Sequence, residues 1–204
     1  MPRLGVVDYG LDNLRSVLTD LDEIDQAAAL ITAAGGVSSC DKIIIPGVGA
    51  FSEAMANLRQ SNMSAALQEH VNAGKPLLGI CLGMQLICRK SYEDGEHQGL
   101  GWIDAEVRHF PPQEGLKVPH MGWNAIDFDK DHSLLRDVAP GADVYFVHSY
   151  YVDCERACDS LGSTDHGIRF TSMVGHANVY GMQFHPEKSQ HVGMQLLRNF
   201  ATLQ

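Results

Sequence analysis

The sequence contains no long hydrophobic segment. Although 45% of its 204 residues are hydrophobic, charged residues and glycines divide them into short runs. A transmembrane helix needs about 20 consecutive apolar residues, and no window approaches this length. The segment Met1–Gly10 has one basic residue, and Asp8 interrupts its apolar stretch, which is not typical of a signal peptide. We therefore expect neither a membrane partner nor secretion.

Basic residues are also scarce. The chain has 15 Lys and Arg residues against 25 Asp and Glu residues, which gives a formal net charge of −10. Nucleic acids and anionic lipid surfaces bind clustered positive charge, so the composition argues against both as partners. Any phosphorylated substrate is expected to belong to a partner chain.

The few cysteines do not form a disulfide pattern. There are five, an odd number, with no regular spacing: Cys40, Cys81, Cys88, Cys154 and Cys158. Secreted disulfide-rich proteins use paired cysteines at framework spacings, whereas reduced thiols are typical of the cytoplasm. We predict free thiols and a cytoplasmic protein.

Short apolar runs alternate with helical patterns in the first half of the chain. Runs that end at glycine or proline turns predict buried strands at Leu4–Asp8, Ile43–Ile45, Leu77–Ile80 and Val144–Val147. Helical spacing or capping signals predict helices at Asn13–Leu21 and Ser64–Ala73, the second beginning at a capping serine and ending at Gly74. This alternation predicts an α/β fold with a mostly parallel sheet, helices on both faces, and ligands at the carboxyl ends of the strands.

The second half has a different pattern. It predicts antiparallel ribbon strands at Ile103–Phe110, Ile168–Val174 and Asn178–Phe184, then a helix from Ser189 to about Leu203. Two segments are less regular. Sheet topology favours a strand near Ala28–Thr32, and the charged segment Ser91–Gln98 is expected to be a loop at the rim of the active site. The length of the chain predicts a single domain, residues 1–204, with a mixed, mostly parallel sheet.

One cysteine stands where a nucleophile would be expected. Gly79-Ile80-Cys81-Leu82-Gly83 follows an apolar run and precedes the helix-like stretch Met84–Cys88. Flanking glycines allow a sharp turn between strand and helix that exposes the side chain between them, a nucleophile elbow. The amide groups at the start of the helix favour a thiolate. Alternatively, Cys81 packs as a small hydrophobic residue.

Two further segments supply the groups that a nucleophilic cysteine needs. His185-Pro186-Glu187 offers an imidazole and a carboxylate, which with Cys81 predicts a catalytic triad. Pro46-Gly47-Val48-Gly49 offers backbone N–H groups for an oxyanion hole. The simpler interpretations are a histidine that caps the last helix and a turn that ends a strand.

Metal binding is the main chemical alternative. His185, Glu187 and His191 are close in sequence, and Cys154 and Cys158 offer sulfur. However, the zinc deaminase pattern requires a Pro-Cys-x-x-Cys motif downstream, which does not follow residue 187. The two cysteines lie among charged residues typical of a solvated loop or helix. We predict no metal site and no cofactor.

Three motifs together resemble the class I, triad-type glutamine amidotransferases along essentially the whole chain. They are Pro46–Phe51, Gly79–Gln85 and Gly181–Ser189. The resemblance implies the single-domain fold of that family, with Cys81, His185 and Glu187 as its triad. It further implies that Cys81 attacks the glutamine amide carbon, with the oxyanion held by backbone N–H groups of Leu82 and the Val48–Gly49 peptide. Glutamine contacts are implied for Gly49, Gln85, Gln98, Ser149 and Tyr150.

Within that family, three stretches are most similar to the glutaminase subunits of imidazole glycerol phosphate synthases. They are Asp8–Val17, Val118–Asn124 and Tyr145–Tyr151, although Asp12 replaces a glycine that the family usually has. The similarity implies a heterodimer in histidine biosynthesis, with ammonia passed to a (β/α)8-barrel cyclase subunit. The residues implied to face that subunit are Asn13, Trp123, Asn124, Tyr145 and Lys188.

Three alternatives remain at this point. The first is a related amidotransferase that supplies ammonia to another pathway, such as the synthesis of nonulosonic acids or other surface sugars. The second is a cysteine hydrolase of the DJ-1/PfpI kind, which shares the nucleophile elbow but lacks a terminal His-Pro-Glu segment. The third is a catalytically silent binding module, which an intact Cys81, His185 and Glu187 argue against.

Overall fold

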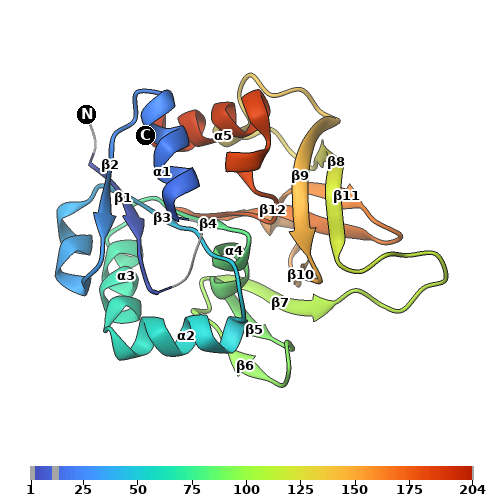
Figure 1. The fold of residues 1–204 in the computed structure, drawn as a ribbon, viewed down its shortest axis with the longest axis horizontal. Helices are drawn as coiled ribbons and strands as arrows, with labels where there is room; N and C mark the ends of the chain where they lie inside the picture. Colours follow the sequence, from blue (N-terminus) through green and yellow to red (C-terminus); the bar gives the residue numbers. More distant parts are fainter. Residues whose placement is uncertain (1–2, 11–13, 204) are drawn as a thin grey trace.

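The computed structural model describes residues 3–10 and 14–203, which are organised around one mixed β-sheet (Figure 1). Asn13, which the sequence placed at the start of the first helix and at the partner interface, lies outside the described residues, as does Asp12. Within the described ranges, no helix is both long enough and apolar enough to span a bilayer.

The secondary structure begins with alternating strands and helices and ends with a strand-rich half. The strands are β1 (Leu4–Val7), β2 (Ala28–Ile31), β3 (Lys42–Ile45), β4 (Leu77–Ile80), β5 (Cys88–Ser91), β6 (His97–Gln98), β7 (Ile103–His109), β8 (His120–Phe128), β9 (Ala142–His148), β10 (Tyr150–Cys154), β11 (Ser160–Asp165), β12 (Arg169–His176) and β13 (Val179–Met182). The α-helices are α1 (Leu14–Glu23), α2 (Phe51–Gln60), α3 (Met63–Asn72), α4 (Leu82–Leu86) and α5 (Gln190–Thr202). Short 3₁₀ helices are η1 (Ala34–Ser39), η2 (Ser133–Leu135), η3 (Ala157–Asp159) and η4 (Pro186–Lys188).

The sheet is parallel on one side and mostly antiparallel on the other, where, among the described strands, only β5 and β7 pair in parallel. The order β2-β1-β3-β4-β13 contains only parallel neighbours. Beyond β13 the neighbours β12, β10 and β7 pair antiparallel, and β5 and β6 follow at the far edge. A branch through β11 and β8 ends at β9. This arrangement confirms the predicted α/β fold with a mixed sheet.

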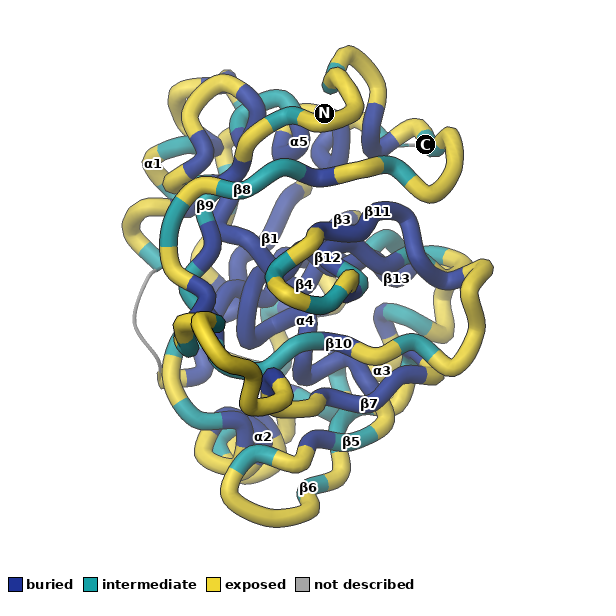
Figure 2. Tube along the Cα trace, turned by 90° about the vertical axis from the view of Figure 1, so that its right-hand side faces the viewer, coloured by how far each residue is buried: buried dark blue, intermediate teal, exposed yellow. Residues whose placement is uncertain are grey.

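Two apolar layers cover the parallel strands, one on each face. Successive strand residues point to opposite faces, so Ile44 packs in the cluster that contains residues of α1 and α5. Its neighbours Ile43 and Ile45 pack instead with residues of α2 and α3. The central strands are accordingly buried, while most loops are exposed (Figure 2). Helices therefore cover both faces, as the alternating pattern predicted.

Several sequence predictions need correction. α3 begins at Met63 after the left-handed Asn62, so Ser64 lies inside the helix and does not cap it. The segment expected as a rim loop ends in the short strand β6. The last strand, β13, was expected in an antiparallel ribbon, but it pairs in parallel with β4 as well as antiparallel with β12. Local patterns do not identify a strand's partners, which are chosen by contacts distant in sequence.

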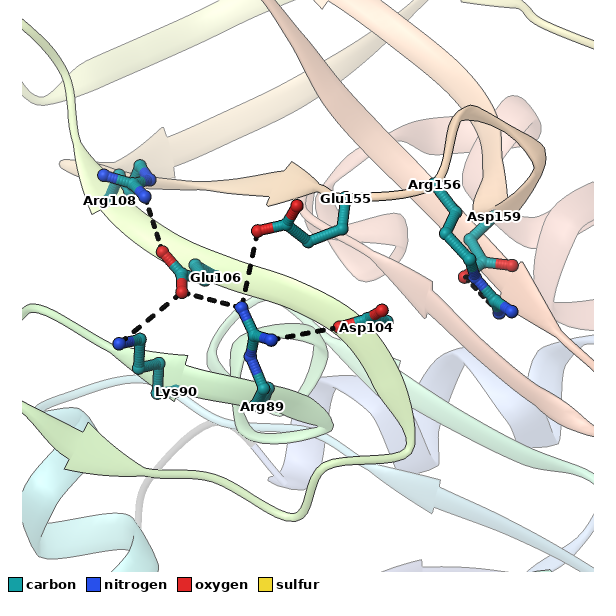
Figure 3. A network of polar contacts seen from close by, with 8 residues as sticks. All are labelled: Arg89, Lys90, Asp104, Glu106, Arg108, Glu155, Arg156 and Asp159. Carbon is teal, nitrogen blue, oxygen red and sulfur yellow. Dashed lines mark hydrogen bonds and ion pairs between the residues drawn. The ribbon is translucent and has the colours of Figure 1, made fainter.

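A charged network joins strands β5 and β7 (Figure 3). Glu106 on β7 is almost buried, and its carboxylate binds Arg89 at 2.8 Å, Arg108 at 2.5 Å and Lys90 at 3.5 Å. Arg89 also reaches Asp104 at 3.5 Å. A carboxylate of this kind is stable in a buried position only because several cations pair with it. The network holds the β5 edge against the sheet next to the predicted site.

Lys42 on β3 is a buried cation that binds the end of the last helix. Its ammonium group donates to the carbonyl oxygens of Phe200 at 3.3 Å, Ala201 at 2.6 Å and Leu203 at 2.5 Å. Carbonyl groups at the end of a helix have no partner within the helix and carry partial negative charge. Lys42 therefore joins the C-terminal end of α5 to the central sheet.

We expect Lys42→Met to lower the free energy of unfolding by about 2–3 kcal/mol, because it leaves buried carbonyl groups without a donor. Denaturant unfolding of the variant and the wild type measures this change. Lys117 is exposed, so Lys117→Met is a matched control that should change stability by less than about 0.5 kcal/mol. Equal stability of the Lys42 and Lys117 variants would contradict the assigned role of Lys42.

Candidate active site

Cys81 lies at the carboxyl end of β4, on the turn that leads into α4. Its backbone has φ +54° and ψ −109°, a conformation that a residue with a side chain rarely adopts. The Cys81 N–H donates to the carbonyl of Met182 on the neighbouring strand β13 at 2.7 Å. The predicted nucleophile is thus mounted on a strained turn between two buried parallel strands.

The positions on either side of Cys81 require glycine because a side chain would collide with nearby backbone atoms. A positive φ is not the reason. A Cβ atom at Gly83 would lie 1.8 Å from the carbonyl oxygen of Ile45, and one at Gly79 would lie 2.4 Å from the carbonyl oxygen of Gly83. Neither glycine has a positive φ, whereas Cys81 does. The prediction that these glycines permit the turn is therefore refined: they allow α4 to pack directly on the backbone of the sheet.

The helix behind Cys81 begins and ends two residues earlier than the predicted stretch Met84–Cys88. α4 ends at Leu86, and Cys88 already belongs to β5. The N–H of Leu82, a predicted oxyanion donor, binds the carbonyl of Gly47 at 3.3 Å. Five residues supply only a small helix dipole. The imidazole of His185 is hydrogen-bonded to Cys81.

His185 and Glu187 form a tight, fully buried pair. Nδ1 of His185 lies 2.6 Å from Oε1 of Glu187, and both side chains have 0% exposure. Burial lowers the pKa of His185, but hydrogen bonds with Cys81 and Glu187, together with their charges, raise it to about 10. The arrangement holds a proton on the imidazole beside the sulfur, which is the electrostatic requirement of a thiolate–imidazolium pair.

The segment that carries this pair is fixed against β9. The His185 N–H donates to the carbonyl of Tyr145 at 2.9 Å. Ser189 closes the contact, because its Oγ donates to the His185 carbonyl at 2.6 Å and accepts from the Tyr145 N–H at 2.9 Å. Pro186–Lys188 forms η4 between these two points. Tyr145 therefore positions the backbone of the imidazole-bearing turn.

Gln183 is a residue of the site that the sequence interpretation did not single out. Its side chain is fully buried, and its Nε2 lies 3.8 Å from the sulfur of Cys81. Its Oε1 accepts from Nε2 of Gln85 at 3.2 Å. Extended residues two apart share a face, so its place two residues before His185 was a signal that it faces the same site.

A cleft of about 340 Å³ opens in front of Cys81. Its lining includes the predicted residues Val48, Gly49, Leu82, Gln85, Ser149 and Tyr150, together with Glu93, Pro119, Val147 and His148. Gln98 is not part of it. That residue is exposed on β6, and its carbonyl accepts from Arg59 at 2.9 Å.

Glu93 lies in the cleft in place of the expected Gln98. Its Oε2 accepts from the N–H of Phe51, the first residue of α2, at 2.5 Å. This bond fixes a carboxylate in the cleft wall, where it can attract a positively charged ligand group. The rim loop predicted from the sequence does contain Glu93. However, the sequence did not indicate which polar residue of this loop faces the cleft.

The side chain of Tyr9 supports the Pro46–Gly49 loop through a hydrogen bond. The buried Tyr9 hydroxyl donates to the carbonyl of Pro46 at 2.7 Å. A Cβ at Gly47 would lie 2.1 Å from the same hydroxyl, so only glycine fits there. The loop brings Val48 and Gly49 to the cleft next to Cys81, as the prediction of an oxyanion hole requires.

Two neutral histidines support the cleft wall that contains Tyr150, and one of them, His148, is itself part of the lining. His148 Nδ1 lies 2.8 Å from the Tyr150 carbonyl, and its Nε2 lies 3.0 Å from Nδ1 of His120. Burial lowers the pKa of His148 to about 3 and that of His120 to about 4, with smaller effects from nearby histidines. Both rings are therefore uncharged at neutral pH.

The predicted partner-facing residues do not all share one surface. Trp123 is 49% exposed, and its ring packs edge-on against Tyr145 with 5.9 Å between centroids. Nζ of Lys188 lies 5.9 Å from the Tyr145 ring centroid. Asn124 instead directs its amide inward, to His120 and the Asp165 carbonyl. Trp123, Tyr145 and Lys188 form one surface, and Asn124 lies on the other face of β8.

No group of three or more His, Cys, Asp or Glu side chains in the described part of the chain is arranged to hold a metal ion. Cys154 ends β10, and Cys158 lies in η3. His185 and Glu187 contact each other within the buried turn.

We predict that acid destabilises the fold through His120 and His148. An unfolded histidine titrates near pH 6.5, whereas these two titrate at about 4 and about 3 when folded. Between these values the unfolded chain binds more protons, so stability falls as the pH drops below 6.5, by up to about 1.4 kcal/mol per pH unit for each histidine. Denaturant unfolding at pH 7, 6 and 5 measures this slope.

The variant His120→Phe should show a shallower slope between pH 7 and pH 5 than the wild type. His109 is exposed, and His109→Gln serves as a control that should retain the wild-type slope. The same slope in all three proteins would contradict the burial of His120 as a neutral group.

Comparison with known proteins identifies the family. Residues 8–203 match the model of the family described as Glutamine amidotransferase class-I. The chain is 46% identical over 199 residues to the imidazole glycerol phosphate synthase subunit HisH of Aquifex aeolicus, covering 97% of this chain and 95% of that protein. It is 42% identical over 203 residues to the subunit of the same name from Moorella thermoacetica, covering 100% and 96%.

Solved structures share the fold at low identity. The structure of PurLQS from Thermotoga maritima has a TM-score of 0.77 at 14% identity, with 98% of this chain and 97% of that chain covered. A glutamine amidotransferase crystal structure has a TM-score of 0.75 at 16% identity, covering 97% and 96%. The chain therefore belongs to the class I glutamine amidotransferases and, among them, to the family of imidazole glycerol phosphate synthase HisH subunits.

Proposed function

We propose that this protein is the glutaminase subunit of an imidazole glycerol phosphate synthase. It hydrolyses glutamine to glutamate and ammonia and passes the ammonia to a (β/α)8-barrel cyclase subunit in histidine biosynthesis. The observation that carries the proposal is the buried His185–Glu187 pair beside Cys81, at the base of a cleft. The identity of 40% or more to HisH subunits over nearly their full lengths supports the choice of pathway.

In this proposal Cys81 is the nucleophile. Its thiolate attacks the side-chain amide carbon of glutamine, a C–S bond forms, and the carbonyl electrons move to the oxygen. When this intermediate collapses, the C–N bond breaks and the imidazolium of His185 gives its proton to the departing nitrogen. Water then attacks the thioester, His185 takes up a proton, and glutamate leaves as the thiolate is restored. Glu187 holds the imidazole with Nδ1 toward its carboxylate throughout.

The oxyanion needs backbone donors from the Val48–Gly49 peptide and Leu82. The N–H of Leu82 is already bound to the Gly47 carbonyl at 3.3 Å, a long hydrogen bond that an oxyanion can replace. Rearrangement of the Pro46–Gly49 loop would therefore accompany catalysis. Glutamine itself would lie along Gly49, Gln85 and the Ser149–Tyr150 backbone, with Glu93 facing its α-ammonium group.

Ammonia released into water would be protonated and lost, which favours direct transfer to a partner. The exposed Trp123 ring, with Tyr145 and Lys188 beside it, has the aromatic and cationic character of an interface centre. The Tyr145 backbone also holds His185, so this surface lies directly behind the reacting groups. We assign it to the cyclase subunit.

We also propose that residues 1–204 act as one amidotransferase domain in the cytoplasm. One sheet connects the strands of both halves, and the family model spans residues 8–203. The five cysteines all lie within the described residues and all have free thiols, which suits a reducing compartment.

We expect Cys81→Ala to lower glutamate release by at least about 10³-fold in the presence of a cyclase subunit and its ligand, because the covalent path is removed. Glu187→Gln should lower it by roughly 10³–10⁴-fold, because the imidazole loses its orienting carboxylate. The exposed thiol of Cys158 is the matched control, and Cys158→Ala should retain full activity. Glutamate release by Cys81→Ala at the wild-type rate would rule out the proposed triad.

We expect Trp123→Ala to weaken binding of a cyclase subunit by roughly 30-fold, since truncation of a central aromatic residue costs about 2 kcal/mol. Calorimetric titration with the purified subunit measures the Kd. Leu30 on β2 is similarly exposed, at 46%, and Leu30→Ala is a control that should bind as the wild type does. A wild-type Kd for the Trp123 variant would exclude this surface as the interface.

A further inference from the structure

Three side chains form an unbroken hydrogen-bonded chain that ends at the glutamine cleft. Nδ2 of Asn124 lies 3.2 Å from Nε2 of His120. Nδ1 of His120 lies 3.0 Å from Nε2 of His148, and Nδ1 of His148 lies 2.8 Å from the Tyr150 carbonyl. His120 and His148 face each other across the β8–β9 pair. Tyr150 lines the cleft.

The direction of every hydrogen bond in this series follows from the last acceptor, the Tyr150 carbonyl. The Tyr150 carbonyl can only accept, so Nδ1 of His148 must carry the hydrogen and its Nε2 must accept from His120. Nδ1 of His120 therefore carries a hydrogen too, and its Nε2 accepts from the Asn124 amide. The amide orientation agrees, because Nδ2 of Asn124 also donates to the Asp165 carbonyl at 2.8 Å and its Oδ1 accepts from the Ala125 N–H at 2.9 Å.

This order is possible only while both rings are neutral. A proton added to either ring would make two N–H groups face each other at one of these contacts. Burial opposes such a proton, since His120 and His148 are 4% and 6% exposed. The other titratable groups that act on them are His166, which stacks on His120 with 4.0 Å between centroids, and His185.

This series of hydrogen bonds ends at the Tyr150 carbonyl oxygen, which belongs to a residue of the cleft wall. The Tyr150 carbonyl accepts from Nε2 of Gln85 at 3.1 Å in addition to His148. Two donors from different elements therefore fix the direction of this carbonyl, which belongs to the Tyr150–Tyr151 peptide and directly follows the Ser149–Tyr150 backbone. A rotated peptide would misplace both the backbone edge and the Gln85 amide at the wall where glutamine is proposed to bind.

We propose that Asn124, His120 and His148 are positioning residues, whose directed hydrogen bonds hold the Ser149–Tyr150 backbone in the conformation that binds glutamine. The inference rests on the proposed glutaminase function. His148 lines the cleft, and none of the three is assigned to the triad or to the oxyanion hole. Their role is to leave a single orientation for the Tyr150 carbonyl, which lowers the cost of organising the cleft when the substrate enters.

The tautomers of His120 and His148 test the proposed hydrogen-bond directions directly. Long-range ¹H–¹⁵N spectra of the intact protein should show His120 and His148 as neutral Nδ1–H tautomers between pH 6 and pH 8, and assignment can use the loss of signals in His120→Phe and His148→Phe. An Nε2–H tautomer or a charged ring at either position would overturn the proposal. This readout does not depend on activity.

Measurement of KM and kcat separates a positioning role of His120 from a purely structural one. His120→Phe retains an aromatic ring beside Phe146 but removes the donor to His148, so KM for glutamine should rise about tenfold while kcat changes less than about threefold. His120→Asn keeps a donor near the former Nδ1 and should restore most of the affinity. His166→Phe alters the same aromatic cluster outside the chain and should leave KM unchanged.

The possible results distinguish two kinds of failure. An unchanged KM in His120→Phe, or an equal rise in His166→Phe, would overturn the positioning role while leaving the glutaminase function intact. Wild-type protein that releases no glutamate with its cyclase subunit, although both Nδ1–H tautomers are present, would instead overturn the proposed function and with it the role assigned to the chain.

Discussion

The architecture of the site depends on one close backbone contact, where α4 packs directly against the ends of β3 and β4. Gly83 lies so near the Ile45 carbonyl, and Gly79 so near Gly83, that no side chain fits between them. This contact forces the chain to turn within one residue, and Cys81 takes the strained conformation that results. The fold thus supplies the energy that holds an unfavourable backbone at the reactive position.

The groups around Cys81 come from elements that are distant in sequence but adjacent in the sheet. β13 pairs in parallel with β4, so the segment after it brings Gln183 and His185 alongside the cysteine. β9 belongs to a separate branch of the sheet, yet the Tyr145 backbone binds the His185 N–H at the start of the turn and the Ser189 hydroxyl at its end. The same strand continues to His148, which supports the cleft wall. A single strand therefore holds both the proposed acid–base group and part of the proposed substrate site.

The pKa values of the buried histidines in this region are shifted in opposite directions, because the groups around them differ. His185 is buried against Cys81 and Glu187, and their hydrogen bonds and charges outweigh desolvation, so its pKa rises. His148 and His120 are buried among aromatic rings and amide groups, and desolvation lowers their pKa values. One set of residues in a small volume can thus provide a charged proton donor for chemistry and neutral, directed hydrogen bonds for positioning.

Elements whose signal is local can be predicted from the sequence alone. The elbow around Cys81, the buried strands β1, β3 and β4, the glycine loop Pro46–Gly49 and the His185-Pro186-Glu187 turn are all readable from short runs of residues, because strand periodicity and turn chemistry act over a few positions. Which polar side chains reach the cleft depends on the tertiary structure. It placed Glu93 there and left Gln98 outside, turned Asn124 inward while Trp123 stayed exposed, and joined His120 to His148. These outcomes depend on strand register and partner choice, and register is set by packing between segments far apart in the sequence, where a shift of one residue exchanges the two faces of a strand.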